Sequence, residues 1–314
     1  MTDILTITFP IYAAIAIGYL VVLKGWFTQA DMRSFGKYVM NIAMPALLFN
    51  AVASRDVGEV LHWGYLAAYT LGGVATIVIA FLWFSVTARD KSRRAIAVLG
   101  STCPNSGFIG YPLMLLTFPE IAGIVLALNM LVELIVLIPV CLVLMDMARD
   151  GAHQSPVRQI AGNIANTFKR PMMLGLLLGL AVSALNLPVP GPVDHLFRMI
   201  AASAAALSLI VIGGSLVGLP LKGNRLFATQ ISAAKLFLHP AMVFLAVLAL
   251  PALGIAPLDP QMFAAVILSA AISMFGIYTV LAQESGLEGL ASIAMLIATS
   301  TAFFTLSALL MLLT

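Results

Sequence analysis

Charged residues are scarce in this sequence. Asp, Glu, Lys and Arg make up 9% of its 314 residues, whereas 61% are hydrophobic. A soluble domain carries about a quarter charged residues, so this composition excludes an ordinary soluble protein and indicates a polytopic membrane protein. Only two cysteines are present, Cys103 and Cys141, and both lie in apolar runs. A disulfide framework and a cysteine metal site are therefore not expected, and no metal or other cofactor is expected either.

Catalytic signatures and long polar segments are also lacking. The sequence contains no HExxH motif, and "GGSL" at 213–216 does not match the GxSG of membrane serine proteases. We therefore expect a protein that is not an enzyme. No break between the apolar runs is long enough for a separate soluble domain, so we expect one transmembrane domain over 1–314.

What the sequence has instead is ten apolar runs, each compatible with the roughly 20 residues of a membrane-spanning helix. The first run follows Asp3 and has no basic residue before it, which predicts a spanning helix rather than a signal peptide. The ten predicted spans lie at about 4–23, 30–54, 62–88, 95–118, 121–147, 169–187, 195–219, 227–250, 260–283 and 288–313.

Basic residues are distributed unequally between the two sides of these spans. Thirteen Lys and Arg residues fall on one side, and only Arg55 and Arg198 fall on the other. The positive-inside rule then places both termini on the extracytoplasmic side, and we expect the membrane to be a bacterial inner membrane. Because topology explains the net charge of +3, a nucleic-acid partner is not expected.

The two halves of the chain show weak, ordered similarity. At an offset of 161, Pro10 and Gly18 match Pro171 and Gly179; at 167, "SGFIGY" (106–111) matches "SMFGIY" (273–278) at three positions. Five spans per half is an odd number, so the second half would be inverted, as in many transporters. Chance matching in apolar sequence is the alternative. The predicted units are a first repeat at 1–148, a cytoplasmic linker at 149–168 and a second repeat at 169–314.

The stretch "STCPNSGFIGYPL" (101–113) interrupts the fourth span, because two prolines and two glycines oppose a continuous helix. Open backbone at membrane depth persists only inside protein or beside a watery cavity. The half-helix that follows, near Gly107–Tyr111, would present free N–H groups to an anion. In the ninth span, which lacks proline, we expect a gentler break at Ser273 and Gly276. Together the two breaks predict a site for a small carboxylate.

Three segments resemble the auxin efflux carrier family, which includes plant auxin carriers and bacterial carriers of malonate. They are "NIAMPALLF" (41–49), "PNSGFIGYPL" (104–113) and "KLFLHPAMVF" (235–244). The resemblance implies an all-α membrane protein of ten helices in two inverted five-helix repeats, with spans four and nine crossing as broken helices. This architecture is also that of bile acid/sodium symporters and of NhaA-type antiporters. It further implies a scaffold set and a transport set of helices that move like an elevator, and it is compatible with a homodimer in the lipid bilayer.

The same resemblance implies that Pro104 and Asn105 lie at the crossover and contact the substrate, while Asn41 and Pro45 line the site. For Asn41, capping of a proline kink is the alternative. Span seven is rich in small residues and is mainly a packing face. The further substrate-binding candidates are Ser106, Gly107, Tyr111, Ser208, Ser273, Gly276 and Tyr278.

The candidates for coupling to H⁺ or Na⁺ are Glu133, Lys235 and His239, which all lie within spans. Glu133 could carry a proton or form a structural hydrogen bond, for example with Asn129 one turn earlier. Lys235 could neutralise a carboxylate, pair with Glu133, or extend to the cytoplasmic surface, which we favour. His239 could relay protons or bond a carbonyl freed by Pro240.

These features predict a secondary transporter of a small organic anion, a mono- or dicarboxylate such as malonate. A cation/proton antiporter is the first alternative, but it would need a mid-membrane Asp that spans four and nine lack. A ligand-binding membrane sensor would need a signalling domain. A channel is not distinguished from a carrier by sequence.

Overall fold

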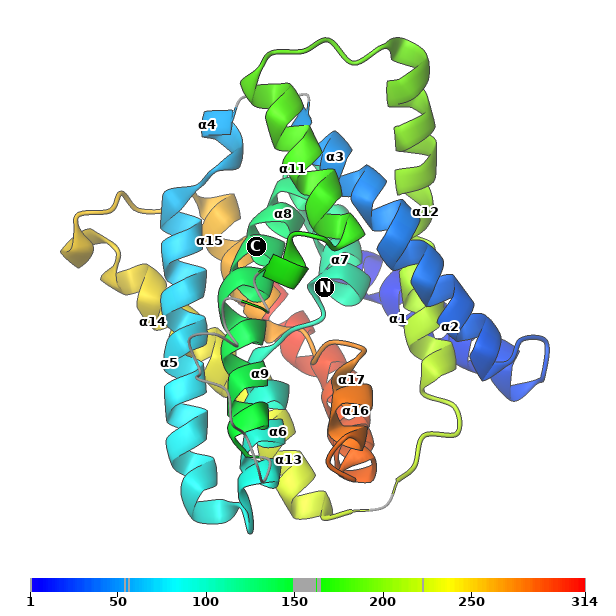
Figure 1. Ribbon diagram of the computed structural model, residues 1–314, viewed down its shortest axis with the longest axis vertical. Coiled ribbons are helices and arrows are strands. Elements are labelled where there is room, and N and C mark those ends of the chain that lie inside the picture. Colours follow the sequence, from blue (N-terminus) through cyan, green and yellow to red (C-terminus); the bar gives the residue numbers. More distant parts are fainter. Residues whose placement is uncertain are drawn as a thin grey trace. The chain divides into compact units, whose positions relative to one another are not determined.

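The computed structural model describes residues 2–53, 55, 57–148, 162, 165–221 and 223–313 (Figure 1). Throughout this described part, the regular structure is helical and the only strand-like pairing is an isolated bridge. Among the described residues, six helices are long and apolar enough to cross a membrane, which makes this a helical, multi-pass membrane protein. They are Thr6–Leu23, Trp63–Thr87, Ala122–Met147, Gly191–Ser215, Arg225–Ala249 and Glu288–Leu313.

The chain divides into two compact units, and each unit draws on both halves of the sequence. The first unit comprises Met1–His62, Ser106–Met130 and Asn166–Gly218. The second unit comprises Trp63–Asn105, Leu131–Ala165 and Leu219–Thr314. The predicted linker at 149–168 lies mostly outside the described residues.

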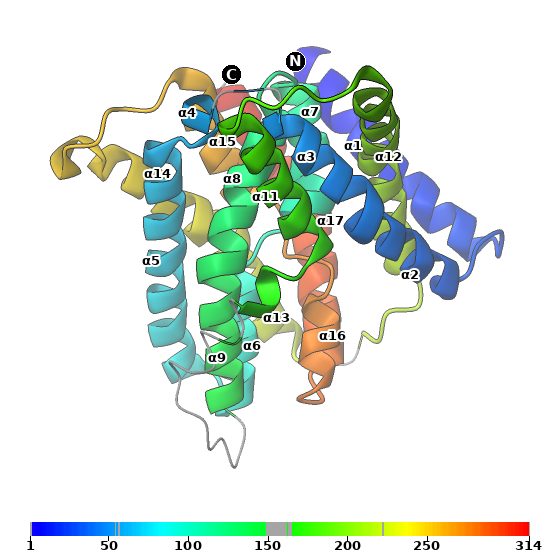
Figure 2. The ribbon, with the colours of Figure 1, turned by 45° about the horizontal axis from the view of Figure 1, so that its top comes forward.

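In the first unit, helices approach closely where glycine replaces a side chain. A Cβ on Gly213 of α12 would lie 2.7 Å from the carbonyl carbon of Ile15 in α1, so these helices pack backbone to backbone. Pro45 of α3 lies in the same way against Gly175 of α11, and Figure 2 shows α3 and α11 side by side. The helices of this unit are α1 (Thr2–Leu23), α2 (Gln29–Tyr38), α3 (Met44–Ala53), α4 (Val57–Val60), α7 (Tyr111–Thr117), α8 (Ala122–Val132), α11 (Pro171–Ala184) and α12 (Gly191–Ser215).

In the second unit, α5 packs along α14 through Gly72, where a Cβ would lie within 3 Å of Val243. Other tight packing joins α13 to α17 and α5 to α6. The helices of this unit are α5 (Trp63–Thr87), α6 (Lys91–Thr102), α9 (Ile138–Met147), α13 (Arg225–Ala233), α14 (His239–Ala249), α15 (Pro260–Ala271), α16 (Tyr278–Gln283) and α17 (Glu288–Leu313), with the 3₁₀ turn η5 (Pro251–Leu253).

In the described part of the chain, four π-helical segments interrupt the α-helices, and each ends two residues before a proline. Proline removes an N–H and collides with the carbonyl four residues earlier. A wider turn avoids both the missing hydrogen bond and the collision. For example, the N–H of His239, just before Pro240, donates to the carbonyl of Ala234, five residues earlier. Such bulges are frequent at functional sites. The segments are η1 (Val39–Ala43), η2 (Ser106–Gly110), η3 (Glu133–Leu137) and η4 (Ala234–Leu238).

The remaining predicted spans are shorter or interrupted. Span two is helical over residues 29–53 but contains η1, and α11 of span six has 14 residues. Spans four and nine each break after an α-helix of 12 residues. The number of ten spans and the inverted repeat therefore stay predictions.

Candidate functional site

Within the second unit, the two interrupted helices meet at their breaks. Pro104, just after α6, forms an antiparallel bridge with Met274, just after α15. The N–H of Asn105 donates to the carbonyl of Ser273 at 2.9 Å, and the N–H of Phe275 donates to that of Cys103 at 3.2 Å. The pairing thus satisfies backbone groups that lipid could not.

The bond pattern explains why proline is accepted at the centre of this pairing. In an antiparallel pair, opposed residues alternate between exchanging hydrogen bonds and exchanging none. Pro104 and Met274 form the kind that exchanges none, because the bonds run between their neighbours. The missing N–H of Pro104 therefore costs the pairing nothing, while the proline still ends α6.

Several predicted site residues lie at or near this pairing. Asn105 is 4% exposed and immediately precedes the helical segment Ser106–Thr117. The hydroxyl of Ser273 accepts a hydrogen bond from Thr299 at 3.3 Å. Tyr278 is fully buried and its hydroxyl donates to the carbonyl of Ile96 at 3.1 Å. This hydroxyl is thus engaged within the protein.

Two further residues at the pairing are Gly276, which has open space beside it, and Thr102, which has an unused hydroxyl. A Cβ on Gly276 would have no neighbour within 4 Å. The hydroxyl of Thr102, the last residue of α6, is buried and has no hydrogen-bond partner among the described residues. Sequence reasoning missed Thr102, although it lies two residues before Pro104.

The other predicted site residues belong to the first unit. Asn41 is exposed and lies in η1, the π-helical turn that accommodates Pro45. Ser208 is fully buried, and its hydroxyl donates to the carbonyl of Ala204 at 2.6 Å in its own helix. Gly107 lies against Met44, and Tyr111 is half-buried at the start of α7.

A buried polar cluster in the second unit contains all three predicted coupling residues. Lys235 and His239 are fully buried and Glu133 is 3% exposed. The Lys235 Nζ lies 2.9 Å from His239 Nδ1 and donates to the carbonyl of Ala270 at 2.6 Å. The hydroxyl of Tyr69 donates to Glu133 Oε1 at 2.9 Å, and its ring stacks on His239. Glu133 acts electrostatically on the Lys235 ammonium.

Our expectation that Lys235 extends to the cytoplasmic surface is wrong, since its ammonium is buried against Ala270. His239 bonds Lys235 through Nδ1, not a carbonyl freed by Pro240, and its Nε2 has no partner among the described residues. The sequence reasoning also missed Tyr69, the hydroxyl partner of Glu133. Tyr65 and Tyr69 are one helical turn apart in an apolar span, which is the signal that could have found them.

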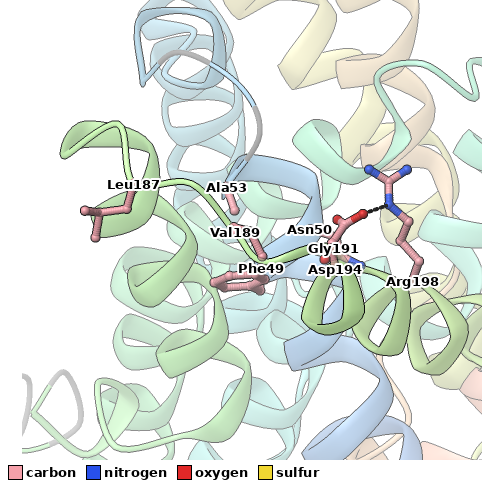
Figure 3. Close-up of a pocket in the computed structure, with 8 residues that line it drawn as sticks. All are labelled: Phe49, Asn50, Ala53, Leu187, Val189, Gly191, Asp194 and Arg198. Carbon is pink, nitrogen blue, oxygen red and sulfur yellow. Dashed lines mark hydrogen bonds and ion pairs between the residues drawn. The ribbon is translucent and has the colours of Figure 1, made fainter.

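A separate cavity of about 300 Å³ opens in the first unit and contains none of the predicted site residues (Figure 3). It is bounded by Phe49 and Asn50 on α3 and by Asp194 and Arg198 on α12. Arg198 Nε donates to Asp194 Oδ2 at 2.8 Å. Among the described residues that line this cavity, the two charged groups, Asp194 and Arg198, therefore neutralise each other. Within the described ranges of the chain, no three His, Cys, Asp or Glu side chains lie close enough together to hold a metal ion.

A transporter class follows from comparison with known proteins. The family described as "Membrane transport protein" matches residues 3–311. The chain belongs to this family, so it is a membrane transporter and not an enzyme. The resemblance to auxin efflux carriers is confirmed by similarity to "Auxin efflux carrier component 4" of Arabidopsis thaliana. That match is 26% identical and covers 43% of this chain and 21% of the plant protein.

Two bacterial relatives match over most of their length. "Putative malonate transporter" of Rhizobium meliloti (strain 1021) is 27% identical over 78% of this chain and 77% of its own length. "Uncharacterized transporter YfdV" of Escherichia coli (strain K12) is 23% identical over 86% of this chain and 88% of its own.

Proposed function

We propose that the protein is a secondary transporter of a small organic anion, a mono- or dicarboxylate of the malonate class. The observation that carries this proposal is the pairing of two interrupted helices at Pro104 and Met274 in a chain of a transporter family. Broken helices at corresponding positions of two halves mark the substrate site in many carriers. The name of the Rhizobium relative supports the choice of malonate as the first substrate to test.

The groups around Asn105 suit a carboxylate because they donate hydrogen bonds. A carboxylate only accepts, and the amide of Asn105 and the hydroxyl of Thr102 can both donate. An acidic residue in place of Asn105 would be expected for a cation carrier. The amide therefore favours the anion carrier over the antiporter.

The division into two units supports alternating access by an elevator-type movement. Each unit contains corresponding segments of the two proposed repeats: 1–62 with 166–218 in the first unit, and 63–105 with 219–314 in the second. Such a composition is what two inverted five-helix repeats would generate. In this proposal the first unit is the scaffold, and the second unit carries the paired breaks with the substrate. Both termini would be extracytoplasmic.

Uptake of radiolabelled malonate into proteoliposomes tests the proposal, with other mono- and dicarboxylates as unlabelled competitors. We expect saturable uptake that structurally related carboxylates inhibit. Proton and sodium gradients imposed separately identify the driving ion. If no carboxylate in the panel is transported or competes above empty liposomes, the anion proposal is overturned.

A further inference from the structure

The carbonyl end of α15 is a place where a cation would be stabilised. The last four carbonyls of a helix lack intrahelical partners, and the helix dipole is negative there. α15 ends at Ala271, inside the protein and directly before the pairing of Ser273 with Asn105. Ala270 and Ala271 are fully buried. In transporters with broken helices, such ends coordinate a coupling Na⁺ or H⁺.

The Lys235 ammonium already lies at this helix end. Its Nζ donates to the carbonyl of Ala270 at 2.6 Å, and the side chain is fully buried. An ammonium has three donors and no acceptor, so His239 Nδ1, 2.9 Å away, accepts its second hydrogen bond. His239 is then neutral and carries its proton on Nε2.

The surroundings of the ammonium hold it in place and balance its charge. The Glu133 carboxylate interacts with it electrostatically from η3, and a buried charge requires such compensation. Tyr69 of α5 contacts both Glu133 and His239. Its hydroxyl donates a hydrogen bond to Glu133 at 2.9 Å, and its ring stacks on His239 with ring centroids 6.1 Å apart. The titratable groups that face Lys235 are thus Glu133, His239, Tyr69 and the thiol of Cys103 on the α6 side.

We propose that Lys235 is a resident cation, which occupies the carbonyl end of α15 in place of a coupling metal ion. Transport by this chain therefore does not depend on sodium, and Lys235 acts as a positioning residue for the paired breaks. The inference rests on the proposed function only for its transport readout. The effect of sodium on the melting temperature can be measured whatever the substrate is.

The test compares Lys235→Ala, which removes the ammonium and opens space, with Lys235→Met, which keeps the volume without the charge. Lys235→Arg keeps the charge, and Lys169→Ala removes an exposed lysine as a control. Malonate uptake and melting temperature in detergent are measured in NaCl, in choline chloride and with added ethylammonium.

We expect uptake by the wild type and by Lys169→Ala to be equal in sodium and choline. Uptake by Lys235→Ala should fall roughly tenfold in choline, because a buried carbonyl loses its donor, and should recover with sodium or ethylammonium. Lys235→Met should lose activity without recovery, and Lys235→Arg should retain part of it. A wild type that requires sodium, or a Lys235→Met variant with full uptake, overturns the inference.

The melting temperatures separate this inference from the proposed function. If the wild type transports no carboxylate, the function fails, but a sodium-dependent rise in melting temperature confined to Lys235→Ala still supports the resident cation. If sodium raises the melting temperature equally in Lys235→Ala, Lys235→Met and wild type, the resident-cation inference is overturned.

Discussion

Pro104 occupies a position in the paired breaks at which an N–H is not needed. The bonds of the pair run from Asn105 to Ser273 and from Phe275 to Cys103. Met274, opposite Pro104, also donates no bond within the pair. The two sides of the pairing thus tolerate proline at the bridge position and require an N–H at the position that follows it.

This pattern predicts different results for proline at two adjacent residues. Met274→Pro should lower the melting temperature no more than Met274→Ala does, because both remove the buried side chain and neither breaks a bond of the pair. Phe275→Pro leaves the carbonyl of Cys103 unsatisfied, which costs roughly 1–3 kcal/mol for a buried acceptor. Thermal unfolding of the purified proteins in detergent measures both. A loss in Met274→Pro beyond that of Met274→Ala, or none in Phe275→Pro beyond that of Phe275→Ala, would contradict the bond assignment.

The buried charges of Lys235 and Glu133 should be energetically coupled. Removing one partner of a buried pair leaves an uncompensated charge and costs about 3–5 kcal/mol, whereas removing both is often nearly neutral. We therefore expect the double variant Glu133→Gln/Lys235→Met to melt at a higher temperature than either single variant. Additive losses in this double-mutant cycle would show that the two groups do not compensate each other.

Among the elements, α1 and α12 depend on glycine for their close approach. A Cβ at Gly213 would overlap the Ile15 carbonyl and lie 2.9 Å from the backbone N of Tyr19. Gly213→Ala should destabilise the protein by about 1–3 kcal/mol through overpacking. Gly191→Ala, at the start of the same helix, has no neighbour within 4 Å and is the matched control. Similar melting temperatures for the two variants would contradict the backbone contact.

Sequence alone predicts some of these elements for clear physical reasons. The break at 103–105 follows from Pro104, because the residue before a proline is disfavoured in the helical conformation and α6 ends just before it. Its partner at 272–275 contains no proline, so only the weak match between the two halves indicated it. The π-helical segments were not predicted, although a proline two residues beyond each of them was visible. They determine where Lys235 points, since one extra residue turns a helix face by about 100°.

At the scale of the whole molecule, sequence patterns could predict a multi-pass membrane protein but not the two units. Hydrophobic periodicity reports which segments enter lipid, and it carries no information on which helices group together. Residues 63–105 and 219–314 belong to one unit, although more than one hundred positions separate them. The buried bond between Tyr69 and Glu133 is likewise a contact between distant spans.

An elevator-type movement predicts distance changes between the units and none within them. In a background with Cys103 and Cys141 replaced by alanine, spin labels are placed at exposed positions. Trp26 and Leu185 form a pair within the first unit, and Trp26 and Val86 form a pair between units. Pulsed electron paramagnetic resonance should give one distance for the first pair and two for the second, with malonate shifting their ratio. A single, substrate-independent distance for both pairs would contradict the movement.

Malonate uptake by wild type and by Asn105→Asp, compared side by side in proteoliposomes, tests the central claim most directly. A carboxylate placed beside the paired breaks would repel an anionic substrate and attract a cation. The anion-carrier account predicts saturable uptake by the wild type that is lost in Asn105→Asp and retained in Asn50→Ala, which alters a buried amide of the first unit. Undiminished uptake by Asn105→Asp would contradict an anion site at Asn105.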